Sequence, residues 1–104
     1  KSVDVTVTTF YPEGANAEFD AGFKAWVNAD ATQLANNGGD DTVAAVTAMG
    51  YDAYFFALEA MKKAASVDPA AIMTALWSTT YEGVSGPIAL DQVNGGALRP
   101  PPYV

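Results

Sequence analysis

The sequence predicts an α/β chain with about three helices and a short, incomplete sheet. Three observations lead to this prediction. Valines alternate with polar residues near the start, apolar residues recur at helical spacing in three middle segments, and a short apolar run precedes an Asn-Gly pair near the end. The expected order is a strand, three helices, a strand and a short return strand, which is too few strands for a complete doubly wound sheet.

The first element is predicted to be a strand over residues 3–9. Val3, Val5 and Val7 alternate there with polar residues, and β-branched side chains favour strands. A Pro and a Gly within residues 11–14 are expected to end this strand in a loop.

An amphipathic helix is predicted over residues 16–28, with Asn16 as its N-cap. Its apolar residues recur at helical spacing, and they are Phe19, Phe23, Trp26 and Val27. Residues 29–41 are polar and end in a run of Asn, Gly and Asp, which predicts a surface loop.

The longest helical pattern covers residues 42–65. Its apolar residues fall on nearly every side of the helix, so this helix is expected to pack on several sides. Another helix is predicted to start at Asp68 as its N-cap, with Pro69 in the first turn, and to end near Ser78.

The last third of the chain is predicted to contain short strands separated by turns. Residues 81–87 are rich in turn formers, and residues 88–90 form a short apolar strand. Residues 91–96 are expected to turn, because Asn-Gly favours positive φ. Leu98 then begins a return strand, and the prolines at 100–102 confine any pairing there to a sheet edge.

Composition excludes several classes of function. The 104 residues are enough for one small domain, and the absence of Cys and His excludes thiol catalysis, disulfides, His general bases and Cys/His zinc sites. Five basic against 12 acidic residues, a net charge of −7, leave no basic stripe for a nucleic-acid partner. No apolar run approaches the roughly 20 residues of a membrane span, and the start at Lys1 leads us to expect that a segment was removed upstream.

Carboxylates offer two candidate sites. Asp40 and Asp41 could supply oxygen ligands to Ca²⁺ or Mg²⁺, but their spacing lacks the alternating acids and distal Glu of an EF-hand, which favours a solvated loop and a cap for the next helix. Asp52 and Glu59 stand seven positions apart on one predicted helix, yet no nucleophile accompanies them. We therefore predict no catalytic residue, no metal ligand and no cofactor.

Four segments resemble a known family in the same order. Residues 47–65 carry Tyr-Asp-Ala at 51–53, followed by an apolar helix that ends in Ala and Lys. Residues 66–76 resemble the family's next helix, and residues 81–97 its Gly-x-x-Gly, strand, Asp and Asn-Gly turn. Residues 3–28 match its strand, aromatic and Pro loop, and helix with regularly spaced Phe. Together they resemble the branched-chain amino-acid (Leu/Ile/Val-type) periplasmic solute-binding proteins of ABC importers.

The resemblance implies a partial lobe of a type I periplasmic binding protein, in which two α/β lobes close on an amino acid or small carboxylate. Residues 1–104 would then be a single fragment of the C-terminal ligand-binding lobe. It further implies a binding protein and not an enzyme, an ABC permease as partner, and a periplasmic or extracellular location. Removal of a signal peptide, with a lipid anchor as an option, is expected on the same basis.

The resemblance also points to three candidate ligand contacts. In the family, the start of the Tyr-Asp-Ala helix lies near the cleft, and this region includes Val46, Met49 and Tyr51. The alternative is that these side chains simply pack the start of the helix. Asp52 is expected to be a structural hydrogen-bond partner.

Other functions stay open. The same lobe could serve a ligand-sensing receptor, and a small hydrolase based on Asp52 and Glu59 is a third hypothesis.

The family's usual Asn-Gly-Asp turn reads Asn-Gly-Gly at 94–96, which lacks one carboxylate. Because the predicted sheet is incomplete, its exposed edges are expected to cause self-association or a swapped dimer.

Overall fold

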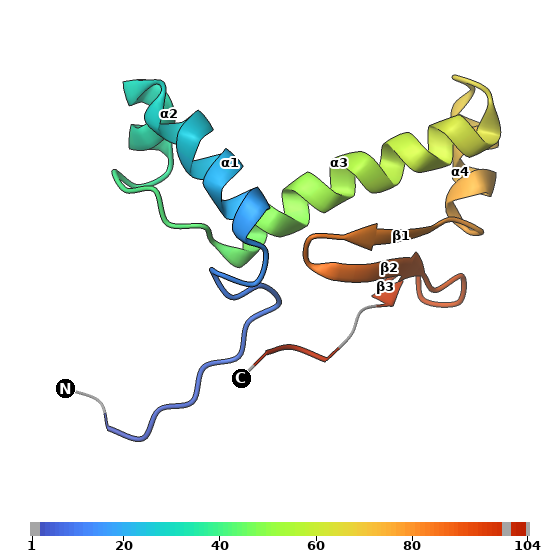
Figure 1. The fold of residues 1–104 in the computed structure, drawn as a ribbon. Coiled ribbons are helices and arrows are strands. Elements are labelled where there is room, and N and C mark those ends of the chain that lie inside the picture. The colour runs from blue at the N-terminus through green and yellow to red at the C-terminus, as the bar shows by residue number, and fades with distance from the viewer. Residues whose placement is uncertain (1–2, 99–100, 104) are drawn as a thin grey trace. The chain divides into compact units, whose positions relative to one another are not determined.

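The structure, a computed structural model, describes residues 3–98 and 101–103 (Figure 1). The chain divides into two compact units, which are described separately: residues 1–48 with 102–104, and residues 49–101. The described part contains four helices, where about three were predicted, and one three-stranded antiparallel sheet. This mixed architecture agrees with the α/β class.

The first helix, α1 (Ala17–Asn28), is confirmed together with its cap. Asn16 has extended backbone, and its side chain accepts a hydrogen bond from the Phe19 N–H at 3.0 Å. This bond satisfies one of the N–H groups that have no partner within the helix. Val27 is completely buried at the end of the predicted apolar face.

A short second helix, α2 (Ala31–Asn36), lies inside the segment predicted to be a loop, so that prediction is wrong over these six residues. Asp30 is its N-cap and accepts a hydrogen bond from the Thr32 N–H at 2.7 Å. The helix contacts α1. Contact with α1 and the Asp30 cap support a helix that is too short and polar to be recognised from periodicity.

The predicted strand over residues 3–9 is not formed. These residues lie outside any helix or strand, and among them only Thr9 is bridged, by an antiparallel pair of hydrogen bonds with Tyr103. A segment with alternating valines forms a strand only when a neighbouring strand is hydrogen-bonded to it. No described residue forms such backbone hydrogen bonds with residues 3–8. Asp4 has φ of 60°, which does not fit a strand.

The long helix α3 (Ala45–Ala64) begins in the first unit and ends in the second. It starts later than expected, at Ala45, so Asp41 lies too far upstream to cap it. The Asp41 carboxylate accepts a hydrogen bond from the Asn28 amide. The expectation of packing on several sides is also wrong. Its buried residues form a single stripe at i, i+4 spacing, whereas Tyr54 and Met61 on the other faces are exposed. The stripe consists of Ala48, Asp52, Phe56 and Ala60.

The second unit continues with α4 (Pro69–Leu76). Its predicted cap is confirmed, because the Asp68 side chain accepts a hydrogen bond from the Ala71 N–H at 3.0 Å. At its end, the Lys63 ammonium donates to the Ser78 carbonyl at 2.5 Å. This bond joins the end of α3 to the turn that follows α4.

The sheet has the strand order β1 (Thr80–Gly83), β2 (Gly86–Leu90) and β3 (Ala97–Leu98), all antiparallel. The predicted strand at 88–90 and the return strand at Leu98 are therefore confirmed. Strand β1 was missed, because its residues lie mostly in the segment predicted to turn. Gly83 pairs with Gly86, so the hairpin turn consists of two residues.

The turn predicted between β2 and β3 is present. The Asp91 carboxylate accepts hydrogen bonds from the Val93 N–H at 2.9 Å and the Asn94 amide at 2.6 Å, and Gly95 has φ of 70°. The backbone N–H of Val93 holds the pKa of Asp91 below its usual value. Of the prolines expected to limit pairing, Pro100 lies outside the described residues.

Candidate functional site

The most highly organised polar cluster of the second unit is built around Asp52 of α3, which is completely buried. One carboxylate oxygen accepts a hydrogen bond from the Val84 N–H at 2.8 Å. The other accepts from the Ser85 N–H at 2.8 Å and from the Ser85 hydroxyl. Val84 and Ser85 are the two residues of the β1–β2 turn, so this carboxylate joins α3 to the hairpin. We call the three residues the Asp52 clamp.

Two glycines make room for the Asp52 clamp. A Cβ on Gly83 would collide with the Asp52 carboxyl group, so only glycine lets the hairpin approach this closely. Gly86 has φ of 102°, which an L side chain rarely adopts. The Gly-x-x-Gly spacing is therefore required both by the turn and by the carboxylate beside it.

The Asp52 clamp confirms the structural role expected for Asp52, but the sequence did not indicate its partners. Ser85 lies 33 positions away along the chain, and a separation of this length has no periodic signal. The available signal was the pairing of two patterns, an Asp on an apolar helix and a later Gly-x-x-Gly. Each pattern alone is common.

The three candidate ligand contacts do not line a common cavity within either unit. Val46 belongs to the first unit and is 74% exposed, whereas Met49 and Tyr51 belong to the second. Met49 is half-buried, and Tyr51 is 43% exposed. The Tyr51 ring packs against Phe55 with centroids 4.8 Å apart. Their contact with a ligand therefore stays a prediction.

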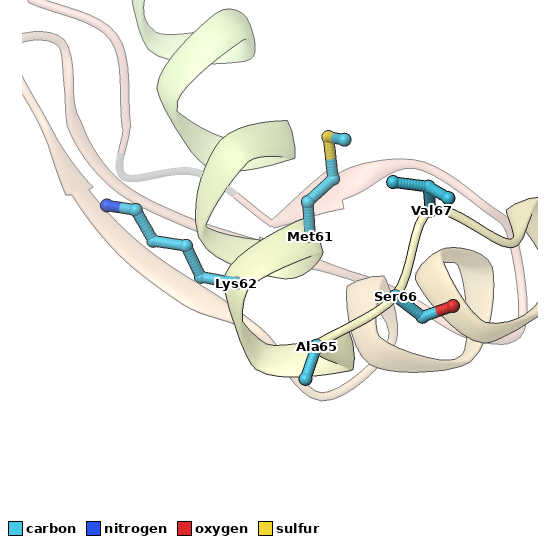
Figure 2. A pocket seen from close by; sticks show the side chains of 5 residues that line it. All are labelled: Met61, Lys62, Ala65, Ser66 and Val67. Atoms are coloured by element: carbon cyan, nitrogen blue, oxygen red, sulfur yellow. The ribbon is translucent and has the colours of Figure 1, made fainter.

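A shallow surface depression lies at the end of α3 and the start of the segment that follows it (Figure 2). Met61 and Val67 supply its apolar surface, and none of the candidate ligand contacts borders it. In Figure 2 the Lys62 side chain points away from Met61; its ammonium bonds to Glu59 at 2.7 Å. The depression offers no convergent polar groups that would orient a substrate. Its lining residues are Met61, Lys62, Ala65, Ser66 and Val67.

The two acidic residues considered as metal ligands serve other purposes in the first unit. Asp40 accepts a hydrogen bond from the Thr42 N–H at 2.8 Å, and this bond lowers the pKa of Asp40. Asp41 accepts from the Asn28 amide at 3.0 Å and lies 3.9 Å from the Lys24 ammonium. Within residues 3–98 and 101–103, no three His, Cys, Asp or Glu side chains are grouped to hold a metal ion.

The carboxylate pair considered for acid–base work is also not brought together. Both oxygens of Asp52 are occupied within the Asp52 clamp, whereas Glu59 is half-buried and pairs with Lys62. Seven residues of helix separate the two positions by about 10 Å along the axis. Asp52 is therefore buried and fully bonded, whereas Glu59 is paired at the surface.

A second buried cluster, which the sequence did not indicate, fixes the loop before α1. The Tyr11 hydroxyl donates to Asp20 at 2.6 Å, and the Gly14 N–H donates to the other oxygen of the same carboxylate, also at 2.6 Å. The Asn16 N–H in turn donates to the Tyr11 hydroxyl oxygen at 3.2 Å. Burial, reinforced by the bond to Asp20, raises the pKa of Tyr11 to about 12.

We expect Tyr11 to titrate late, because its pKa is raised to about 12. Because the pKa of Tyr11 is near 10 when unfolded and about 12 when folded, unfolding releases a proton between these values. Its contribution to stability is therefore complete below pH 10 and is lost as the pH rises toward 12. Near-ultraviolet absorbance should show a late-titrating phase that disappears in Tyr11→Phe; a phase unchanged in this variant would contradict the assignment.

Comparisons with family models, with curated proteins and with solved structures found no match. Among the described residues, no helix combines the length and apolar character that crossing a membrane requires. What bears on function is therefore the chain's own residues and the way in which the fold brings its motifs together.

Proposed function

We propose that this chain is part of the ligand-binding lobe of an extracytoplasmic solute-binding protein that serves an ABC importer. Its substrates are amino acids or related small carboxylates, and its task is binding without covalent chemistry. The observation that supports this proposal is the Asp52 clamp. The Asp of Tyr-Asp-Ala bonds directly to the turn within Gly-Val-Ser-Gly, so two motifs that carry the family resemblance meet in space.

In the proposed mechanism, ligand binding raises the population of a closed state in which two lobes contact the same ligand. A ligand can shift this equilibrium only by its difference in affinity for the closed and open states. The Asp52 clamp would fix the hairpin against α3, so that the lobe moves as a rigid body. The permease would then recognise the closed, loaded protein in the periplasm or at the cell surface.

Val46, Met49 and Tyr51 are the proposed ligand contacts of this lobe. All three offer mainly apolar surface, and Val46 and Tyr51 keep much of it exposed in the described chain. A ligand side chain held between two lobes would cover this surface and gain the free energy of its burial. The exposure of these residues is therefore compatible with contacts that form only on closure.

Isothermal titration of the intact protein against the amino acids and small carboxylates tests the proposal. We expect saturable one-to-one binding of at least one of them. Val46→Asp and Tyr51→Ala should each weaken this binding by about tenfold or more, which corresponds to about 1.4 kcal/mol. Val93→Asp, a change at an exposed valine on the β2–β3 loop, serves as the matched control and should leave affinity unchanged. Absence of binding heat for every compound would exclude the ligand class.

A further inference from the structure

Residues 5–8 run as an elongated segment outside any helix or strand at the start of the first unit (Figure 1). Val5 and Val7 are 67% and 72% exposed. No backbone hydrogen bond links residues 3–8 to any described residue. A run of extended backbone with unpaired N–H and C=O groups and β-branched side chains is a template for another strand.

The bridge at Thr9 determines which edge of this segment is open. The Thr9 N–H donates to the Tyr103 carbonyl at 2.9 Å, and the Tyr103 N–H donates to the Thr9 carbonyl at 2.7 Å. Because successive residues of a strand direct their polar groups to opposite edges, a strand continued from Thr9 would direct those of Thr6 and Thr8 away from Tyr103. Pro101 lacks the N–H that would continue the bridge toward the chain interior.

We infer that a second copy of this chain pairs with the open edge, in an antiparallel ladder centred on Thr6. In this register Thr6 lies opposite Thr6 of the second copy as a hydrogen-bonded pair. Val5 then lies opposite Val7 as a non-hydrogen-bonded pair, where cross-strand side chains approach most closely. This inference is independent of the proposed function.

Self-complementarity is what identifies a second copy as the partner. The register places valine against valine and threonine against threonine, and both pairs are favourable in antiparallel sheets. It also places Asp4 opposite Thr8. Asp4 is the only charged residue in residues 3–9, so this register avoids repulsion between the two Asp4 carboxylates. Asp4 must leave its positive φ to join the ladder, which limits the strength of the pair.

Two further properties of the pair follow. The ladder is short, so the association should be weak and should depend on concentration in the micromolar to millimolar range. Each chain carries a net charge of −7, and the repulsion between copies is screened by salt. Raising the salt concentration should therefore strengthen the dimer, in contrast to an association based on ion pairs.

Sedimentation equilibrium of the 104-residue chain at low and high salt tests the inference. We expect a monomer–dimer equilibrium that Val5→Lys and Thr6→Pro each weaken by about tenfold or more. Val67→Lys, which makes the same charge change at a valine that is 86% exposed, should weaken it much less. A monomer at millimolar concentration and high salt, or equal weakening by Val67→Lys, would overturn the inference.

Cross-linking tests the register itself. The chain has no cysteine, so Thr6→Cys introduces a single thiol on the two-fold axis of the proposed ladder. Cα atoms of a hydrogen-bonded antiparallel pair lie about 5.5 Å apart, which a disulfide can span. Mild oxidation should yield a covalent dimer much faster with Thr6→Cys than with Val67→Cys. Equal rates for the two variants would exclude this register.

Discussion

Replacement of Asp52 by alanine is expected to lower the free energy of unfolding of the second unit by about 3 kcal/mol. The substitution removes the acceptor for three donors at once: the N–H groups of Val84 and Ser85 and the Ser85 hydroxyl. Ser85 is buried, so its donors cannot turn to bulk water without disturbing the hairpin. Urea denaturation followed by circular dichroism measures the loss.

Two further variants test the origin of this effect. Asp52→Asn keeps the shape of the side chain but directs an amide N–H₂ at one or more of the donors, so it should also be strongly destabilising. Glu59→Gln removes a carboxylate from the same helix at a solvent-accessible ion pair, and it should change stability by less than about 0.5 kcal/mol. A loss below about 1 kcal/mol for Asp52→Ala would show that the Asp52 clamp does not stabilise the unit.

Gly83→Ala is expected to cost about 2–4 kcal/mol, although it adds only a methyl group to a strand residue. The added Cβ would collide with the Asp52 carboxyl group, which three hydrogen bonds hold in place. Either the hairpin or the carboxylate must then move, and the bonds of the Asp52 clamp lengthen. The same denaturation experiment measures the change.

A double variant separates this collision from an intrinsic preference of the strand for glycine. In the Asp52→Ala background the carboxyl group is absent, so Gly83→Ala should cost much less than it does in the natural chain. Gly96→Ala is the matched control, because a Cβ there meets no atom within 4 Å and the residue has no positive φ. Additive losses in the double variant would rule out the collision as the cause.

Local signals accounted for the elements that the sequence predicted correctly. The helices α1 and α4 begin where Asn16 and Asp68 place a side-chain acceptor beside free N–H groups, and a cap of this kind depends on neighbours only. The turn before β3 follows in the same way from Asn94 and Gly95. These interactions span three or four residues, so the sequence alone contains the information.

Elements that depend on distant partners were predicted poorly. Residues 3–9 have the composition of a strand, but a strand exists only with a hydrogen-bonded neighbour, and composition does not reveal whether one is present. Apolar residues on all sides of α3 predicted broad burial, yet only the stripe through Asp52 and Phe56 is fully buried. The role of Asp52 could be predicted, but its partner Ser85 could not, because no periodic pattern in the intervening sequence indicates which residue will lie beside Asp52.

The β1–β2 turn can be regarded as an anion-binding site whose bound anion is a carboxylate of the same chain. Consecutive N–H groups and a hydroxyl, the donors with which proteins commonly grip free carboxylates, are all directed at Asp52. The Asp52 carboxylate cannot diffuse away, so it competes with any dissolved anion at a very high effective concentration. If the proposed function holds, the α-carboxylate of an amino-acid ligand would therefore be held by other groups, and this turn would contribute to recognition only through the rigidity it gives to α3.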